Sequence, residues 1–252
     1  MILTRRAAVY GSVLAVTIVA WILLTASGAV KPILLAAPLD VLGELGHLLS
    51  HPAKVLEPIG VTLAEATVAL AVAAVAGIVT GFAIGPSELG VRAYEPLITT
   101  LSALPLVILY PVLAATLGIG SPSKVAIGAL YGYFPVAIAT LRAVHRVDRG
   151  LLTAARTMGA RRIALATSVV LPAVSSPVIA SMRVAMSLSL VTIIAAEFIS
   201  GAAGVGYQLA TASQGLDTPA LFAWVVIAIA LTVVVNIAFT MVTTLTSKGI
   251  ER

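Results

Sequence analysis

Cysteine is absent from the sequence, and charge is scarce: only 10% of the 252 residues are Asp, Glu, Lys or Arg. The missing cysteines exclude disulfide bonds, thiolate metal sites and a cysteine nucleophile. A soluble globular domain is typically about 25% charged, whereas this chain is 60% hydrophobic with a mean hydropathy of +1.11. Most of its surface is therefore expected to face lipid.

Motifs for nucleotide binding and catalysis are also missing. A P-loop requires a glycine before its lysine and a serine or threonine after it, and none of the four lysines has these neighbours. The three histidines lie outside the apolar stretches, so neither a serine–histidine site nor a metal-dependent site is predicted at membrane depth. We predict no catalytic residue and no metal or cofactor bound by this chain, which disfavours an intramembrane enzyme.

Six apolar stretches are long enough to cross a bilayer, which needs roughly 20 residues per helix. They cover residues 7–29, 61–84, 97–118, 124–141, 172–198 and 219–245. Backbone groups in lipid must be hydrogen-bonded internally, so each stretch is expected to be a helix. The predicted fold is all-α: one polytopic membrane domain over residues 1–252. The first stretch has one alternative, a signal peptide, because Arg5 and Arg6 precede it and small residues end it.

Basic residues indicate how these helices are oriented. If the N-terminus is cytoplasmic, eleven basic residues outside the spans lie in the cytoplasm and three lie outside the cell. The positive-inside rule favours this orientation, which places both termini in the cytoplasm. The net charge of +5 then reflects topology and contact with membrane lipid. The basic residues lack the interleaved aromatics of a nucleic-acid surface, so no nucleic acid is predicted as a partner.

A segment of about residues 30–60 separates the first two spans. Within them, Pro38 to Pro58 reads as an amphipathic stretch at the outer membrane interface. His47 and His51 have the i, i+4 spacing that can hold a metal, but no HExxH pattern accompanies them and Pro52 ends the helix. We therefore assign this segment to the interface and not to a metal site.

Small residues and prolines mark two further features of the spans. Glycines recur at four-residue intervals at Gly77, Gly81 and Gly85, and again at Gly128 and Gly132. This spacing predicts helix faces that neighbouring backbones can approach closely. Prolines inside the third and fourth spans predict kinked helices; they are Pro105, Pro111 and Pro135.

Polar residues inside the fifth span are candidates for a translocation pathway. They are Arg183, Ser187, Ser189, Thr192 and Glu197. A charge within the membrane normally faces protein or water, so Arg183 either locks the bundle or attracts an anion. Glu197 is either a gate residue or a partner of the turn that follows it. The hydroxyl groups either face the pathway or bond to carbonyls of their own helix.

The longest cytoplasmic segment, about residues 142–171, carries six arginines and broken helical periodicity. Gly159 is a helix-terminating residue and Pro172 can open the next helix, so we expect two short helices around a glycine. Such a shape fits the groove of another protein. A basic loop resting on anionic lipid is the alternative.

The same segment resembles the cytoplasmic signature of ABC importer permeases, known as the EAA motif. That signature reads EAA, three residues, G, nine residues, I, any residue, LP. This chain has Thr153, Ala154 and Ala155, then Gly159, then Val169, Leu171 and Pro172 at the same spacings. The resemblance implies a coupling helix that docks on a separate ATPase. The residues it implies for this contact are Thr153, Ala154, Ala155, Met158, Gly159, Ala160, Arg161, Leu171 and Pro172.

One departure from the signature is Thr153, which stands where the family has Glu. An acid near a helix start interacts favourably with the helix dipole. Threonine can instead cap the helix through its hydroxyl group. A cap at Thr153 would preserve the docking geometry, although any salt bridge made by the family Glu is missing.

Two further segments resemble the nitrate, sulfonate, taurine and bicarbonate branch of these permeases. They are the third span with its outer turn, YEPLITTLSALPLVILYPVLAATLGIGSPSKV, and the fifth span, SMRVAMSLSLVTIIAAEFISGAAGVGYQL. The resemblance implies a type I importer permease (MetI-like) fold in the bacterial inner membrane. It implies a second permease subunit, by default another copy of this chain, and two ATPase subunits that hold ATP and Mg²⁺. It also implies an extracytoplasmic solute-binding protein and a small anionic solute.

An ion-coupled secondary transporter or channel is the alternative function. Such proteins carry ionisable residues deep in their spans. Here Glu65 and Glu197 lie near the outer ends of their spans and Arg183 lies deeper. This is a sparse set for a proton relay, so the importer permease is favoured.

Overall fold

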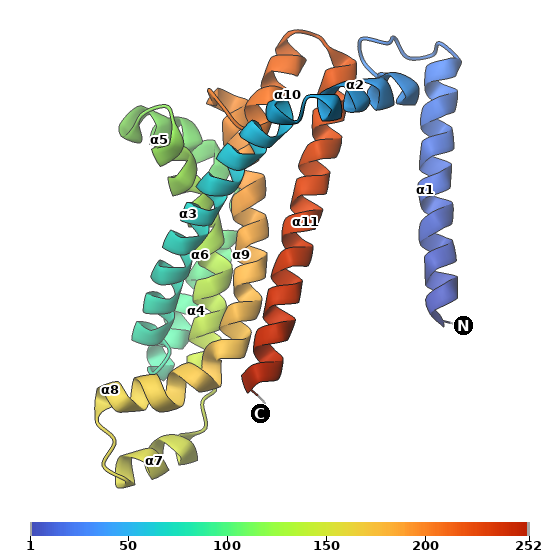
Figure 1. Ribbon diagram of the computed structural model, residues 1–252. Coiled ribbons are helices and arrows are strands. Elements are labelled where there is room, and N and C mark those ends of the chain that lie inside the picture. Colours follow the sequence, from blue (N-terminus) through green and yellow to red (C-terminus); the bar gives the residue numbers. More distant parts are fainter. Residues whose placement is uncertain (1, 251–252) are drawn as a thin grey trace.

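The computed structural model describes residues 2–250, with side chains described for 10–241 except 14 and 162, and all the regular secondary structure in this range is helical. A 3₁₀ turn and a π-helical turn accompany eleven α-helices in this range (Figure 1). In chain order the elements are α1 (Ile2–Ala26), α2 (Pro38–Ser50), α3 (Pro52–Ile84), α4 (Glu88–Ser102), η1 (Leu106–Leu109), α5 (Tyr110–Leu117), α6 (Ser121–His145), α7 (Arg149–Thr157), α8 (Arg162–Leu165), η2 (Ala166–Val170), α9 (Leu171–Ser200), α10 (Val205–Gln214) and α11 (Thr218–Ile250).

Four helical runs are long and apolar enough to cross a membrane. They are Pro52–Ile84, Ser121–His145, Ile163–Gln214 and Thr218–Met241. The pair of Glu88–Ser102 and Leu106–Leu117 counts as a fifth if it forms one bent span, and α1 contributes the shorter apolar helix Tyr10–Ala26. An all-α chain with several membrane helices is thus confirmed, whereas the number six and the side of the termini stay predictions.

The third span differs from the prediction. Instead of one kinked helix over 97–118, α4 and the helix after it meet at an angle of 77°. The chain leaves the helical region at Pro105, whose ψ is 68°. Proline has no N–H to continue a helix and restricts the residue before it, so the kink becomes a full break.

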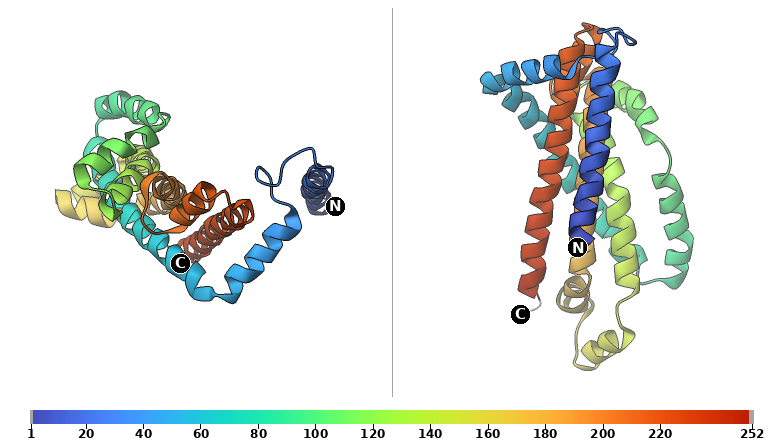
Figure 2. Two further views of the ribbon diagram at one scale, coloured as in Figure 1. Left: turned by 90° about the horizontal axis from the view of Figure 1, so that it is seen from above. Right: turned by 90° about the vertical axis from the view of Figure 1, so that its right-hand side faces the viewer.

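Helices α3, α6 and α9 pack side by side at the centre of the bundle (Figures 1 and 2). A Cβ added at Gly77 or Gly85 would lie 2.8 Å from the Cβ of Val136 or Val144 on α6. On the other face of α6, a Cβ at Gly128 would lie 2.9 Å from Ile193 of α9. The close backbone approach predicted from the glycine spacing is confirmed.

The amphipathic stretch is shorter than predicted. Helix α2 ends at Ser50, and Pro52 starts α3, which runs unbroken through Pro58. Proline is well suited to the first turn of a helix because its missing N–H has no partner there. The second span therefore begins nine residues before the predicted position 61.

The bundle has two distinct ends. Helices α2 and α10 lie at one end, and α7 and α8 lie at the other, which we call the coupling end (Figure 1). The first turn of α1 and the last turn of α11 point towards the coupling end as well. Helix α1 stands apart from the central helices, with Trp21 contacting Phe222 at 5.9 Å between ring centroids (Figure 2).

Candidate functional site

The coupling end carries residues 142–171, here called the coupling segment, as two short helices around a glycine, as predicted (Figure 1). The cap of α7 is Asp148, whose carboxylate accepts a 2.7 Å hydrogen bond from the Gly150 N–H. Thr153 lies inside the helix, and its hydroxyl donates to the Arg149 carbonyl at 2.8 Å. Thr153 is therefore not the cap of the helix, and Asp148 supplies the acid at the helix start.

Gly159 ends α7 in the left-handed region, with φ of +85°. The Gly159 N–H donates to the Arg156 carbonyl and the Ala160 N–H to the Ala155 carbonyl, both at 3.0 Å. These two bonds form a Schellman motif, which requires a left-handed residue at this position. No atom lies within 4 Å of a Cβ built on Gly159. Within this chain, the glycine is needed for its backbone conformation and not for close packing.

The tip of the coupling segment is open and exposes apolar side chains. The side chains of Met158 and Ile163 are 87% and 79% exposed, and Ala154 and Arg161 are exposed as well. A cavity of about 750 Å³ lies behind α7, between Thr153 and Leu152 on one side and Phe82 on the other. Exposed large apolar side chains of this kind mark a candidate interaction surface.

The remaining predicted coupling residues lie away from this tip or behind it. Ala155 and Ala160 are half-buried in the turn, whereas Leu171 and Pro172 form the exposed first turn of α9. The π-helical turn η2 joins α8 to α9, and the whole run from Ile163 to Gln214 counts as one candidate span. The coupling segment is therefore continuous with the central helix of the bundle.

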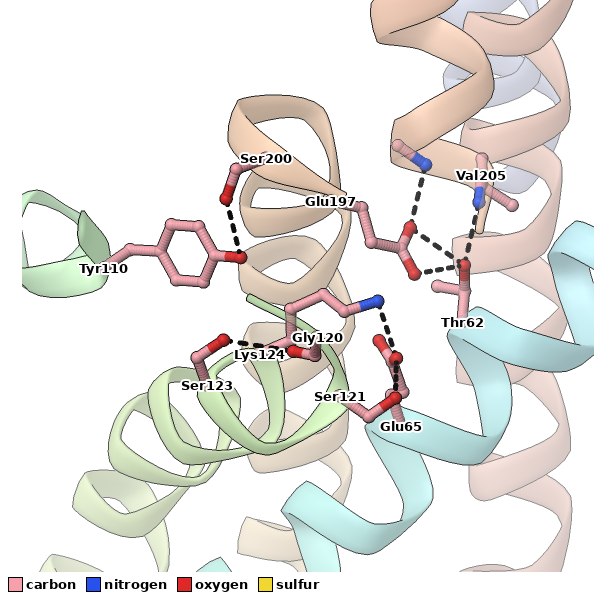
Figure 3. A network of polar contacts seen from close by, with 11 residues as sticks. Thr62, Glu65, Tyr110, Gly120, Ser121, Ser123, Lys124, Glu197, Ser200 and Val205 are labelled. Atoms are coloured by element: carbon pink, nitrogen blue, oxygen red, sulfur yellow. Dashed lines mark hydrogen bonds and ion pairs between the residues drawn. The ribbon is translucent and has the colours of Figure 1, made fainter. Parts of the chain in front are cut away.

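A network of polar contacts occupies the opposite end of α9 (Figure 3). The Glu197 carboxylate is fully buried and accepts hydrogen bonds from the Thr62 hydroxyl at 2.9 Å and from the Gly206 N–H at 2.8 Å. The Val205 N–H donates to the Thr62 oxygen at 2.9 Å. Glu197 and Thr62 thus satisfy the first amides of α10 and hold it against α3 and α9. Gly204, with φ of +102°, has no room for a Cβ beside the carboxylate.

A buried ion pair lies next to this network and was missed by the sequence analysis. Lys124, at the start of the predicted fourth span, was counted among the three basic residues outside the cell, yet only 3% of its surface is accessible. Its Nζ lies 2.6 Å from Oε1 of Glu65, which also accepts a 2.7 Å bond from the Ser121 hydroxyl. Oε2 of Glu65 is buried without a hydrogen-bond partner among the described residues. The pair joins the start of α6 to α3 (Figure 3).

Replacing Lys124 with methionine is expected to destabilise the bundle by about 3–5 kcal/mol, because it leaves the Glu65 charge buried and unpaired. Replacing Glu65 and Lys124 together by methionine removes both charges and should restore most of the lost stability. Thermal unfolding of the purified proteins in mild detergent measures the difference. Equal stability of the single and the double variant would contradict this assignment.

The five candidate pathway residues do not share one face of α9. The Arg183 guanidinium donates to the Thr240 hydroxyl of α11 at 3.0 Å, and Ser187 lies 3.0 Å from Asn236 Oδ1 on the same side. Ser189 is buried and donates to the Gly128 carbonyl of α6 at 2.9 Å. Thr192 is buried in the core, and Glu197 belongs to the network around α10. Of these residues, Arg183 lines a cavity, and Ser187 is bonded to Asn236 in the wall of the same cavity.

Comparison with known proteins identifies the chain's relatives. Residues 73–252 match the model of the family described as binding-protein-dependent transport system inner membrane component. A probable ABC transporter permease protein of Brucella melitensis biotype 1 is 30% identical over 82% of this chain and 83% of its own length. The taurine transport system permease protein of Escherichia coli strain K12 is 26% identical over 89% of this chain and 83% of its own length. A nitrate import permease protein of Leptolyngbya laminosa is 28% identical over 59% of this chain and 53% of its own length.

The match extends over more than two thirds of the sequence and includes the coupling segment and the helices α6, α9 and α11 that the polar contacts join. It confirms the resemblance that the glycine and Leu-Pro spacing predicted. The chain therefore belongs to the family of inner-membrane components of binding-protein-dependent transport systems, the permeases of bacterial ABC transporters.

Proposed function

We propose that this chain is the translocating subunit of an ATP-driven importer for a small anion. An extracytoplasmic binding protein delivers the solute, two copies of this chain form the pathway, and two ATPase subunits bind ATP and Mg²⁺. Six membrane helices with both termini in the cytoplasm place the coupling segment beside the ATPase. Relatives that are named for taurine and nitrate transport support the anionic solute.

The observation that carries this proposal is the coupling segment itself. Its exposed tip, formed around Met158 and Gly159, lies at one end of the bundle and is backed by a cavity. Docking into a cleft of the ATPase would bury these apolar side chains, which accounts for their exposure in the isolated chain.

The route from the coupling segment to the pathway runs along α9. A movement of α8 is passed through η2 into α9, because these elements form one helical run. At the far end of α9, Glu197 is tied to α10 and to Thr62 of α3. In this mechanism, closure of the ATPase dimer on ATP tilts α9 and moves α10 with it. The two bundles then rock between outward-open and inward-open states.

The test is co-purification from native membranes in mild detergent, followed by mass spectrometry. A subunit with Walker motifs is expected at equal stoichiometry with this chain. A variant in which the exposed tip residues Met158 and Ile163 are both replaced by glutamate is purified in the same way. It should lose the ATPase while the membrane bundle stays intact. If no ATPase is found and the chain moves solute alone in liposomes, an ion-coupled transporter replaces this proposal.

A further inference from the structure

Arg183 is a cation inside the membrane bundle that has no acidic partner among the described residues. It lies twelve residues after the start of α9, or about 18 Å along the helix at 1.5 Å per residue. Its side chain is exposed, and the contact found for it is the hydrogen bond to the Thr240 hydroxyl. A charge at this depth is costly unless it is paired or hydrated, so an anion beside Arg183 would be stabilising.

The groove between α9 and α11 offers room for more than a small anion. A cavity of about 350 Å³ is lined by Arg183, Asn236 and Thr240, together with Thr232 and Val233. A second cavity of about 410 Å³ shares Thr232 and Val233 with the first. The other residues of this second cavity are apolar: Val191, Ile194, Leu209, Val225, Ala228 and Ile229. The groove is therefore polar and cationic at one end and apolar at the other.

We propose that this groove binds a single-chain anionic amphiphile from the bilayer, with its acidic head on Arg183 and its aliphatic chain along α11 towards Val225. Asn236 and Val225 are eleven residues apart, or about 16.5 Å along the helix, which suits an alkyl chain. Val191, Ile229 and Val233 are exposed side chains, so the chain can enter sideways from lipid. The site is separate from the coupling segment and does not depend on which solute the permease carries.

Trp224 provides a direct readout, because it lies one helical turn from Ala228, which lines the apolar cavity. The probe is a long-chain carboxylic acid with a nitroxide near the middle of its chain, added to the full-length protein in phosphatidylcholine nanodiscs. Trp21→Phe leaves Trp224 as the single tryptophan. We expect this acid to quench Trp224 fluorescence saturably, whereas phosphatidylcholine with the same nitroxide at equal mole fraction should quench weakly.

Two variants and a control test the two ends of the groove. Arg183→Met should weaken the acid's apparent affinity about tenfold or more, since it removes the partner of a desolvated charge. Ala228→Phe should abolish saturable quenching by filling the apolar cavity. Val79→Phe, at an exposed position of α3, should leave the affinity unchanged. Equal quenching by both nitroxide probes, or unchanged affinity in both groove variants, would overturn the proposal.

Competition by unlabelled anions separates an amphiphile from a small solute in the unmodified groove. Dodecanesulfonate should displace the acid far better than ethanesulfonate, because each buried methylene strengthens binding about fourfold. Equal competition would mean that the groove selects only the anionic head, which contradicts the proposal. Loss of self-association on Ala228→Phe would show that a second copy of the chain fills the groove, and this result would also overturn it.

Discussion

Replacing Gly159 with valine is expected to lower transport about tenfold or more while the protein still inserts and folds. The left-handed φ of +85° is strained by roughly 1–3 kcal/mol for residues other than glycine, and most for β-branched ones. Relief of this strain would open the Schellman turn and rotate Met158 away from its present direction. ATPase stimulation and solute uptake in proteoliposomes measure the effect, and binding-protein-dependent stimulation should decrease together with uptake.

Two matched substitutions at Gly159 separate backbone conformation from docking. Asparagine tolerates the left-handed region, and no atom of this chain lies within 4 Å of the new Cβ, so Gly159→Asn should retain most of the activity. Gly159→Asp can adopt the same backbone but adds a negative charge beside the exposed Met158. It should lose activity only if the tip is buried against the ATPase. Wild-type transport by the valine variant would refute the conformational argument, and wild-type transport by the aspartate variant would refute docking.

Gly206→Ala is the second substitution with a large expected effect. The added methyl group would collide with the Ile194 carbonyl oxygen and lie 2.6 Å from Glu197 Cβ and 2.9 Å from the Phe198 nitrogen. Two of these three atoms belong to the backbone of α9, which cannot move aside as a flexible side chain can. Helix α10 must separate from α9, and the bond between the Gly206 N–H and Glu197 is lost. We expect a loss of about 1–3 kcal/mol in stability.

Thermal unfolding in detergent tests this prediction, with Gly60→Ala as the control. Gly60 lies in α3, and no atom lies within 4 Å of a Cβ added there. Alanine is also the better helix former, so this variant should unfold at the same or a slightly higher temperature. If both variants unfold at the wild-type temperature, the close contact between α9 and α10 is wrong. Equal destabilisation of both would mean that the effect is not local to that contact.

Several features of this chain could be predicted because they depend on short stretches of sequence. A long apolar run must be helical in lipid wherever it packs, so the spans of α3, α6, α9 and α11 were predicted to within about ten residues. The four-residue spacing of Gly77, Gly81 and Gly85 predicted a close neighbour on one helix face. That neighbour is α6, which the spacing could not identify.

Other predictions failed where a local rule had more than one outcome. Proline either kinks a helix or ends it, and at Pro105 the chain breaks, whereas α3 continues through Pro58. Threonine either caps a helix or lies inside it, and Asp148, five residues earlier, occupies the cap instead of Thr153. The choice depends on which hydrogen-bond partners the surrounding structure supplies.

The sequence by itself determined the membrane class, the helical spans, and the two short helices around Gly159 that led to the permease family. All of these follow from hydrophobicity, spacing and backbone conformation within about thirty residues. Only the tertiary structure decided that Glu197 meets Thr62, which lies 135 residues away, and that Lys124 is buried on Glu65. It also decided that Arg183 opens on a groove beside α11. These contacts depend on how the helices rotate against one another. The same local sequence allows a polar residue near the end of a span to face water, lipid or a partner side chain.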